Sequence, residues 1–230
     1  MGCDRAVRVP DVDSIAIFDL DGTLIPRPSA ELRFAVKRVR EGSLGPLGLL
    51  RWLACGIGEL RHHGWHSWKR SKAYLAGADV AEVQSSAERF VHEVLVDLLR
   101  PSMLARLREH QAAGSEVLLL SGAPDFIARP LCARLGIAHC IAAQCDVRNG
   151  YFTALPARLH PFGAEKLSLA RAFCEARRHP IEQAIAYGDS SDDAPLLQAV
   201  GRAVAVHPDA RLEQLARSRC WDVVSWPTGS

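Results

Sequence analysis

The sequence predicts an α/β protein in which a parallel β-sheet carries helices on both faces and a helical segment is inserted after the first strand. After about residue 100, short apolar runs alternate with helical patterns, which is the order that a parallel sheet requires. Residues 26–98 break this alternation, because they are rich in helix-forming residues and contain no convincing strand. Polar residues gather where the apolar runs end, at the sheet edge where such folds bind ligands.

The first strand is the apolar run SIAIF at residues 14–18. It is followed at once by two acids, Asp19 and Asp21, which flank a single leucine. The helical segment at 26–98 comes next and is interpreted as a cap. The chain therefore divides into a core made of residues 1–25 and 99–230 and a cap made of residues 26–98.

The remaining elements belong to the core. A helix at 101–114 has Pro near its start and Gly at its end, as helices often do. A hairpin is predicted at 147–153 around the Asn149-Gly150 pair. The alternating pattern gives strands at 115–121, 183–189 and 202–208, and helices at 124–135, 163–178 and 193–200.

Composition indicates a soluble globular protein. The chain has 230 residues, of which 48% are hydrophobic and 23% are charged. Its 28 basic and 26 acidic residues are too evenly balanced to suggest a nucleic-acid surface. The seven cysteines form no CxxC pair, so they are interpreted as reduced thiols. No signal peptide is visible at the N-terminus, and a cytoplasmic location is expected.

Acidic residues recur at the ends of successive strands. Asp19 and Asp21 follow the first strand, and three more follow IAYG: Asp189, Asp192 and Asp193. Each of these taken singly also fits a helix N-cap or a turn. Several carboxylates at one sheet edge repel one another unless a hard divalent cation lies among them, and Mg²⁺ prefers a few such oxygens with waters and a phosphate. The sequence therefore predicts a Mg²⁺ site at this edge.

Four motifs then appear in order: DLDGT at 19–23, a strand ending in Ser121-Gly122, Lys166 at the start of a helix, and GDSSDDAP at 188–195. In this order the chain resembles the haloacid dehalogenase superfamily, subfamily IB, in the branch that is similar to phosphoserine phosphatase. The resemblance covers residues 14–208. It implies a Rossmann-like sheet core, with a helical cap between the first and second motifs.

The resemblance also implies residue roles. Asp19 is expected to attack phosphorus and form an aspartyl-phosphate, while Asp21 protonates the leaving oxygen and later activates water. Dehalogenases of the superfamily lack the second acid, so Asp21 favours phosphoryl chemistry. The residues expected to hold the phosphate are Thr23, Ser121, Gly122 through its backbone N–H, and Lys166.

The metal ligands implied by the resemblance are Asp19, Asp189 and the backbone carbonyl of Asp21, with Asp193 supporting the metal's water shell. Asp192 is left out of this set. Phosphoserine phosphatases usually carry Asn at that position, and a carboxylate there faces the substrate phosphate less favourably.

The cap departs from phosphoserine phosphatases, which place a Glu nine residues after the nucleophile to receive the substrate ammonium. Here that position is Pro28, so phosphoserine is an unexpected substrate. The cap also carries Trp52, Trp65 and Trp68 among basic residues. These belong either to the core of the cap itself or to a patch that makes weak contact with a membrane surface or an amphiphilic phosphate ester.

The expected function is that of a Mg²⁺-dependent phosphatase acting on a small phosphate monoester, with no nucleic acid and no obligate protein partner. Two alternatives use the same motifs: a phosphotransferase, and a phosphatase for phosphoserine or a lipid head group. A binding protein without turnover is disfavoured because the acids and Lys166 are intact.

Overall fold

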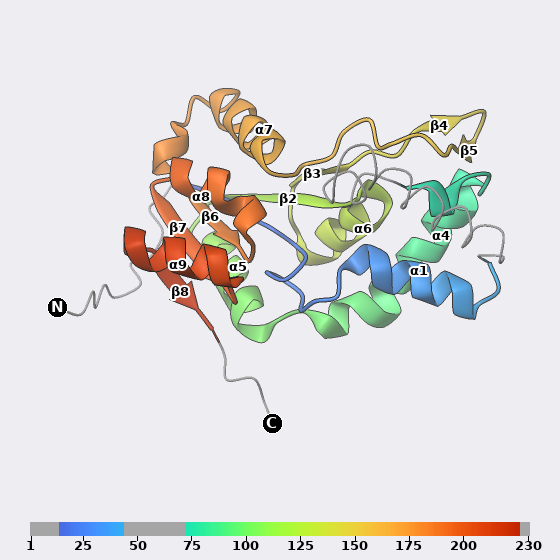
Figure 1. The fold of residues 1–230 in the computed structure, drawn as a ribbon, viewed down its shortest axis with the longest axis horizontal. Coiled ribbons are helices and arrows are strands. Elements are labelled where there is room, and N and C mark those ends of the chain that lie inside the picture. Colours follow the sequence, from blue (N-terminus) through green and yellow to red (C-terminus); the bar gives the residue numbers. More distant parts are fainter. Residues whose placement is uncertain (1–13, 44–71, 226–230) are drawn as a thin grey trace.

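A computed structural model describes residues 14–43 and 72–225. Its centre is a sheet of six strands in the order β3-β2-β1-β6-β7-β8, in which every neighbouring pair is parallel (Figure 1). The first strand therefore lies in the middle, between β2 and β6. The strands are Ile15–Phe18 (β1), Glu116–Pro124 (β2), His139–Ala143 (β3), Ile185–Gly188 (β6), Arg202–Val206 (β7) and Asp222–Val224 (β8).

Helices cover both faces of this sheet. Among the described residues, α1 and α4 belong to the insertion between β1 and α5, and the others follow it. The α-helices are Ala30–Arg40 (α1), Val80–Phe90 (α4), Pro101–Ala112 (α5), Asp125–Leu135 (α6), Ala164–Glu175 (α7), Ala194–Ala199 (α8) and Ala210–Arg219 (α9). Short helical turns are Ala73–Leu75 (η1), Val91–Leu95 (η2), Val96–Leu98 (η3), Ile181–Gln183 (η4) and Ser191–Asp193 (η5).

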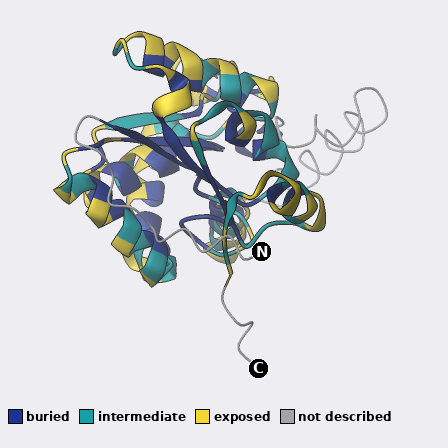
Figure 2. Cartoon of the chain, turned by 90° about the vertical axis from the view of Figure 1, so that its left-hand side faces the viewer, coloured by how far each residue is buried: buried dark blue, intermediate teal, exposed yellow. Residues whose placement is uncertain are grey.

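The central strands β1, β2, β6 and β7 are mostly buried, because each face of the sheet has its own apolar core (Figure 2). Alternate residues of β1 point to opposite faces, so Phe18 packs with α5 and α6 while Ile17 packs with α7, α8 and α9. The insertion shares the first of these cores. Phe34 of α1 lies 5.5 Å from Phe90 of α4 and 5.7 Å from Phe126 of α6, measured between ring centroids.

A small hairpin, Val147–Arg148 (β4) and Tyr151–Phe152 (β5), also joins the insertion. The backbone N–H groups of Gly77 and Phe152 donate to the carbonyls of Phe152 and Ala78, at 2.9 and 3.0 Å. The N–H of Val80 donates to the carbonyl of Gly150 at 3.0 Å. Residues 150–152 are thus bound to residues 77–80, which lead into α4.

The predicted fold class is confirmed: an α/β sheet core with helices inserted after the first strand. The structure adds β3, β8 and α9, which the sequence analysis did not single out. It also extends β2 to Pro124, where a strand to residue 121 was predicted. The register between β2 and β3 shifts between Leu120 and Pro124, so the polar pair Ser121-Gly122 lies in an irregular part of the strand.

The patch of Trp52, Trp65 and Trp68 lies outside the described residues. In the described part of the chain, no helix combines the length and the apolar character that crossing a bilayer needs.

Candidate active site

The loop after β1 places two carboxylates at the centre of the sheet edge. Asp19 is buried, and its backbone N–H donates to the carbonyl of Tyr187 in β6 at 3.1 Å. Asp21 Oδ1 accepts a 2.7 Å hydrogen bond from the N–H of Ala30, the first residue of α1. Directly after Asp21 the chain turns at Gly22, whose φ is +93° and whose added Cβ would lie 1.9 Å from Asp189 Oδ2. Glycine is therefore required there for both conformation and space.

Lys166 joins the two sides of the site. It lies near the start of α7, and its side chain is buried. Its Nζ donates to Asp19 Oδ1 at 2.7 Å and to Asp193 Oδ1 at 2.6 Å. Burial alone would lower the pKa of this ammonium, but the charges of Asp19 and Asp193 outweigh burial and raise it. Lys166 is therefore a permanent cation beside Asp19.

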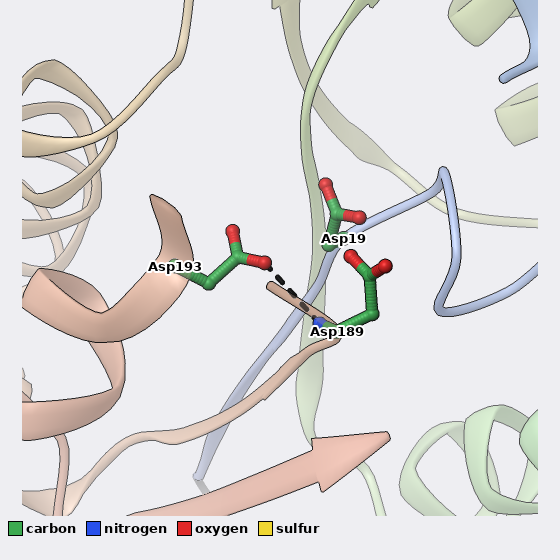
Figure 3. Close-up of side chains that lie close together, drawn as sticks. All are labelled: Asp19, Asp189 and Asp193. Atoms are coloured by element: carbon green, nitrogen blue, oxygen red, sulfur yellow. Dashed lines mark hydrogen bonds between the residues drawn. The ribbon is translucent and has the colours of Figure 1, made fainter. Parts of the chain in front are cut away.

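The turn after β6 holds the other two acids. Asp193 Oδ2 accepts from the backbone N–H of Asp189 at 3.2 Å (Figure 3). It also accepts from the backbone N–H of Ser190 at 3.3 Å and from Ser190 Oγ at 3.2 Å. These bonds fix the side chain of Asp193 against the backbone of the turn. Asp189 Oδ2 in turn accepts from Nε and Nη2 of Arg27 at 2.9 and 2.7 Å.

Ser121 and Gly122 enter the same site from β2. Ser121 is buried, and its Oγ accepts from the N–H of Ala123 at 3.1 Å. A Cβ on Gly122 would lie 3.3 Å from Cε1 of His160, so the His160 ring covers this short stretch of backbone closely. His160 itself is buried and stacks on Phe162, with 5.8 Å between ring centroids.

These groups surround one cavity of about 890 Å³. Its floor comes from the sheet edge, and part of its wall comes from the first turns of α1 and from Tyr74. Of the predicted site residues, those that line it are Asp19, Asp21, Ser121, Gly122, Lys166, Asp189 and Asp193, and Asp192 lines it as well. Thr23 is fully buried and is not part of the described lining, so its role stays a prediction.

Burial raises the pKa values of the acids. It brings the pKa of Asp19 to about 7, although Lys166 opposes the rise and the charges of Asp193 and Asp189 add to it. Burial also brings the pKa of Asp21 to about 7, although the hydrogen bond from the N–H of Ala30 lowers it. The pKa of Asp189 rises to about 6, through burial and then through Asp193, with Arg27 opposing. Burial thus outweighs the stabilisation that Lys166 gives to Asp19 and that Arg27 gives to Asp189.

This donor set fits a divalent cation. One carboxylate oxygen from each of Asp19, Asp189 and Asp193 lies within 4.8 Å of the other two (Figure 3). Hard oxygen donors at this spacing suit Mg²⁺. An added positive charge among them would also oppose the burial and the repulsion that raise the pKa values of Asp19 and Asp189.

Sequence reasoning missed several residues of the site. Arg27 was not singled out, and neither was His160. Asp209 was missed as well: its Oδ2 accepts from the N–H of Ser191 at 2.7 Å and its own N–H donates to the carbonyl of Asp189 at 3.0 Å. The signal for Asp209 was local, since it is an Asp directly before a helix. Arg27 and His160 lie in loops, and their place in the cavity follows only from the fold.

Comparison with known proteins identifies the class. Residues 16–198 match the family model of haloacid dehalogenase-like hydrolases. A probable phosphatase of Mycobacterium tuberculosis is 30% identical over 222 residues, which cover 94% of this chain and 77% of that protein. A phosphoserine phosphatase of the same organism is 28% identical over 228 residues, covering 96% of this chain and 73% of that protein.

A solved structure agrees on the fold. A phosphoserine phosphatase captured as a phospho-aspartyl intermediate analogue has a TM-score of 0.61 at 16% sequence identity, with 93% of each chain covered. The chain belongs to the haloacid dehalogenase-like hydrolases. Within that family it is a phosphatase-type hydrolase of the phosphoserine phosphatase-like branch.

Proposed function

We propose that this protein hydrolyses small phosphate monoesters in two displacements, with Asp19 as the nucleophile. The observation that carries the proposal is the arrangement around Asp19. Its carboxylate lies at the end of the central strand, 2.7 Å from Lys166 Nζ, and Asp21 lines the same cavity. A nucleophile, a fixed cation and a second acid are the three groups that phosphoryl transfer through an enzyme carboxylate needs.

In the first displacement, an Asp19 oxygen attacks phosphorus and the bond from phosphorus to the leaving oxygen breaks. Asp21 gives its proton to that oxygen, so an alcohol departs. A carboxyl with a pKa of about 7 is protonated in a useful fraction of molecules near neutral pH. Lys166 stabilises the charge on Asp19 and on the transferring phosphoryl group.

In the second displacement, a water attacks phosphorus and the bond from phosphorus to Asp19 breaks. Asp21, now deprotonated, accepts the water's proton. Ser121 and the N–H of Gly122 are proposed to hold a phosphoryl oxygen, because both reach the cavity from the irregular end of β2. Inorganic phosphate is then released.

Asp19, Asp189 and the backbone carbonyl of Asp21 are proposed to hold Mg²⁺, with Asp193 oriented by its bonds from Asp189 and Ser190. When bound, the cation supplies positive charge that screens the carboxylates from an anionic substrate. The residues 26–98 are proposed to act as the cap that covers the cavity.

Phosphoserine is proposed to be a poor substrate. Pro28 lines the cavity in place of an acid that would receive an ammonium group. The relatives include proteins named as phosphoserine phosphatases, so phosphoserine is the substrate against which this proposal is tested.

The test is hydrolysis of p-nitrophenyl phosphate with Mg²⁺, after chelation, and after Mg²⁺ is restored. Chelation should abolish activity and Mg²⁺ should restore it. Asp19→Asn should abolish turnover while the fold, followed by circular dichroism, is kept. Beryllium fluoride should bind the wild type and fail to bind Asp19→Asn. Near-normal turnover by Asp19→Asn would rule out the covalent route, and transfer of phosphate to added glycerol would indicate a phosphotransferase.

A further inference from the structure

In the described part of the insertion, one carboxylate lines the wall of the cavity. Glu31 lies in the first turn of α1, one residue after the Ala30 N–H that binds Asp21. Its side chain is 20% exposed and lines the same cavity as Asp19 and Asp21. A group attached to a phosphate held at Asp19 therefore extends into the space that Glu31 borders.

This carboxylate already has a counter-ion inside the protein. Lys72 Nζ donates a hydrogen bond to Glu31 Oε2. The Lys72 side chain is only 2% exposed and does not line the cavity, so it contacts Glu31 from behind the wall. Removing a buried ammonium from its carboxylate partner is costly, and the pair is therefore a fixed feature of the wall.

The surroundings of the pair are largely apolar. Leu32 and Ala35 of α1 line the cavity beside Glu31, and so does buried Tyr74. Burial raises the pKa of the Tyr74 hydroxyl, and the negative charge of Glu31 raises it further. Arg27 also lines the cavity, and its guanidinium is bound to Asp189.

The pair changes what Glu31 can recognise. An unpaired carboxylate in such a wall would attract an ammonium group. When Glu31 is paired with Lys72, an incoming ammonium is repelled by the like charge of Lys72 at short range. This repulsion cancels most of the attraction to Glu31. A hydroxyl group is not repelled by Lys72 and still donates a hydrogen bond to the carboxylate.

We propose that the Glu31–Lys72 pair makes the cavity select phosphate esters whose leaving group is neutral and hydroxylated, and reject those that carry an ammonium group. This inference rests on the proposed function, because it concerns the leaving group of the same reaction. It assigns specificity to Glu31 and Lys72, neither of which takes part in the chemistry at phosphorus.

Two esters of equal size test the proposal: 2-hydroxyethyl phosphate and 2-aminoethyl phosphate. The wild type should hydrolyse the hydroxyl ester with a kcat/KM at least about tenfold higher, since a repelled or unpaired charge in a binding wall costs about this much or more. Lys72→Met should reduce this ratio about tenfold, chiefly by raising kcat/KM for the amine ester. Glu31→Gln should move the ratio the other way, because the positive charge of Lys72 then lies beside the leaving group without the negative charge of Glu31.

Lys37→Met is the matched control. Lys37 forms an ion pair with Glu41 on the same helix, and neither residue lines the cavity. This variant should leave the ratio unchanged. Circular dichroism and turnover of p-nitrophenyl phosphate report whether each variant is folded and active. Should Lys72→Met not fold, the ratio of the two esters measured with Glu31→Gln tests the proposal instead.

These measurements distinguish a failure of the proposed function from a failure of the inference about specificity. A wild type that hydrolyses neither ester nor p-nitrophenyl phosphate contradicts the proposed function itself. A wild type that is active but prefers the amine ester overturns the inference about specificity alone. The inference about specificity is also overturned if both variants are active and the ratio of kcat/KM for the two esters stays at its wild-type value.

Discussion

Arg27 is the residue whose place in the site was least expected. Its side chain is 63% exposed, yet its guanidinium makes two hydrogen bonds to one oxygen of Asp189. Asp189 is also a proposed Mg²⁺ ligand. Arg27 and Mg²⁺ are therefore expected to compete for the same carboxylate.

Arg27→Ala should increase Mg²⁺ affinity by about 2- to 5-fold, the range that corresponds to the loss of one exposed ion pair. Titration calorimetry of the wild type and the variant measures this directly. Arg40→Ala, which removes an exposed arginine at the other end of α1, should leave the affinity unchanged. Weaker binding by Arg27→Ala would mean that the guanidinium helps to arrange Asp189 rather than competing for it.

At the scale of secondary structure, the turn η5 is held in place by Asp209, the residue that caps α9. Asp209 caps α9 by accepting from the N–H of Leu212 at 2.8 Å, and it also accepts from the N–H of Ser191 in η5. Burial opposes its ionisation, but these backbone N–H groups outweigh burial and lower the pKa of Asp209. One carboxylate thus ties the start of α9 to the turn that carries Asp189.

Asp209→Ala should lower the free energy of unfolding by about 1 to 2 kcal/mol, as loss of a helix N-cap does. It should also weaken Mg²⁺ binding by about tenfold, because groups that orient metal ligands have effects of this size. Asp79→Ala is the matched control, since Asp79 caps α4 by accepting from the N–H of Glu82 at 3.0 Å. It should show the loss of stability with Mg²⁺ affinity unchanged, and equal affinities for all three proteins would contradict the coupling.

The sequence predicted the elements best where apolar runs were long and bounded. The strand at 14–18 and the hairpin around Asn149-Gly150 are present, because a buried central strand and an Asn-Gly turn both leave strong local patterns. The edge strand β8 was missed because it has only three residues, and β3 because His139 and Cys140 interrupt its apolar pattern.

The same contrast holds for the site. The acids after β1 and β6 were found because parallel strands bring their ends to one sheet edge. Arg27, Glu31 and His160 come from loops or from the insertion, and their side chains reach the cavity only through packing between segments far apart in the sequence. No local pattern encodes that packing.

For the whole molecule, one buried histidine links stability to pH. His110 of α5 is almost fully buried, and its Nε2 lies 2.8 Å from the Tyr187 hydroxyl. Tyr187 stacks on Phe18 with 4.3 Å between ring centroids, so this contact lies under the centre of the sheet. Burial lowers the pKa of His110 to about 4, and the charges of Arg202 and Arg106 contribute.

Because the folded-state pKa is below the unfolded value of 6.5, the unfolded chain binds the His110 proton first as pH falls. The neutral His110 therefore contributes its full stabilisation above pH 6.5. Between pH 6.5 and about pH 4 this contribution is lost, which lowers the free energy of unfolding by at most about 3 kcal/mol. Urea unfolding of the wild type and of His110→Gln, at pH values between 7 and 4, measures it. The difference in free energy of unfolding between the two proteins should shrink as pH falls, and a constant difference would show that His110 is not the group involved.

The hydrogen bonds between the hairpin and the start of α4 have a consequence for how the insertion opens. Outward motion of the insertion either carries the hairpin with it or separates the amides of Gly77, Val80 and Phe152 from their carbonyl acceptors. Those three amide protons therefore record the motion in their rates of exchange with solvent deuterium. Protection that persists during turnover means that residues 77–80 and 150–152 move as one rigid body, whereas exchange that keeps pace with catalytic cycles means that the two segments part each time product leaves.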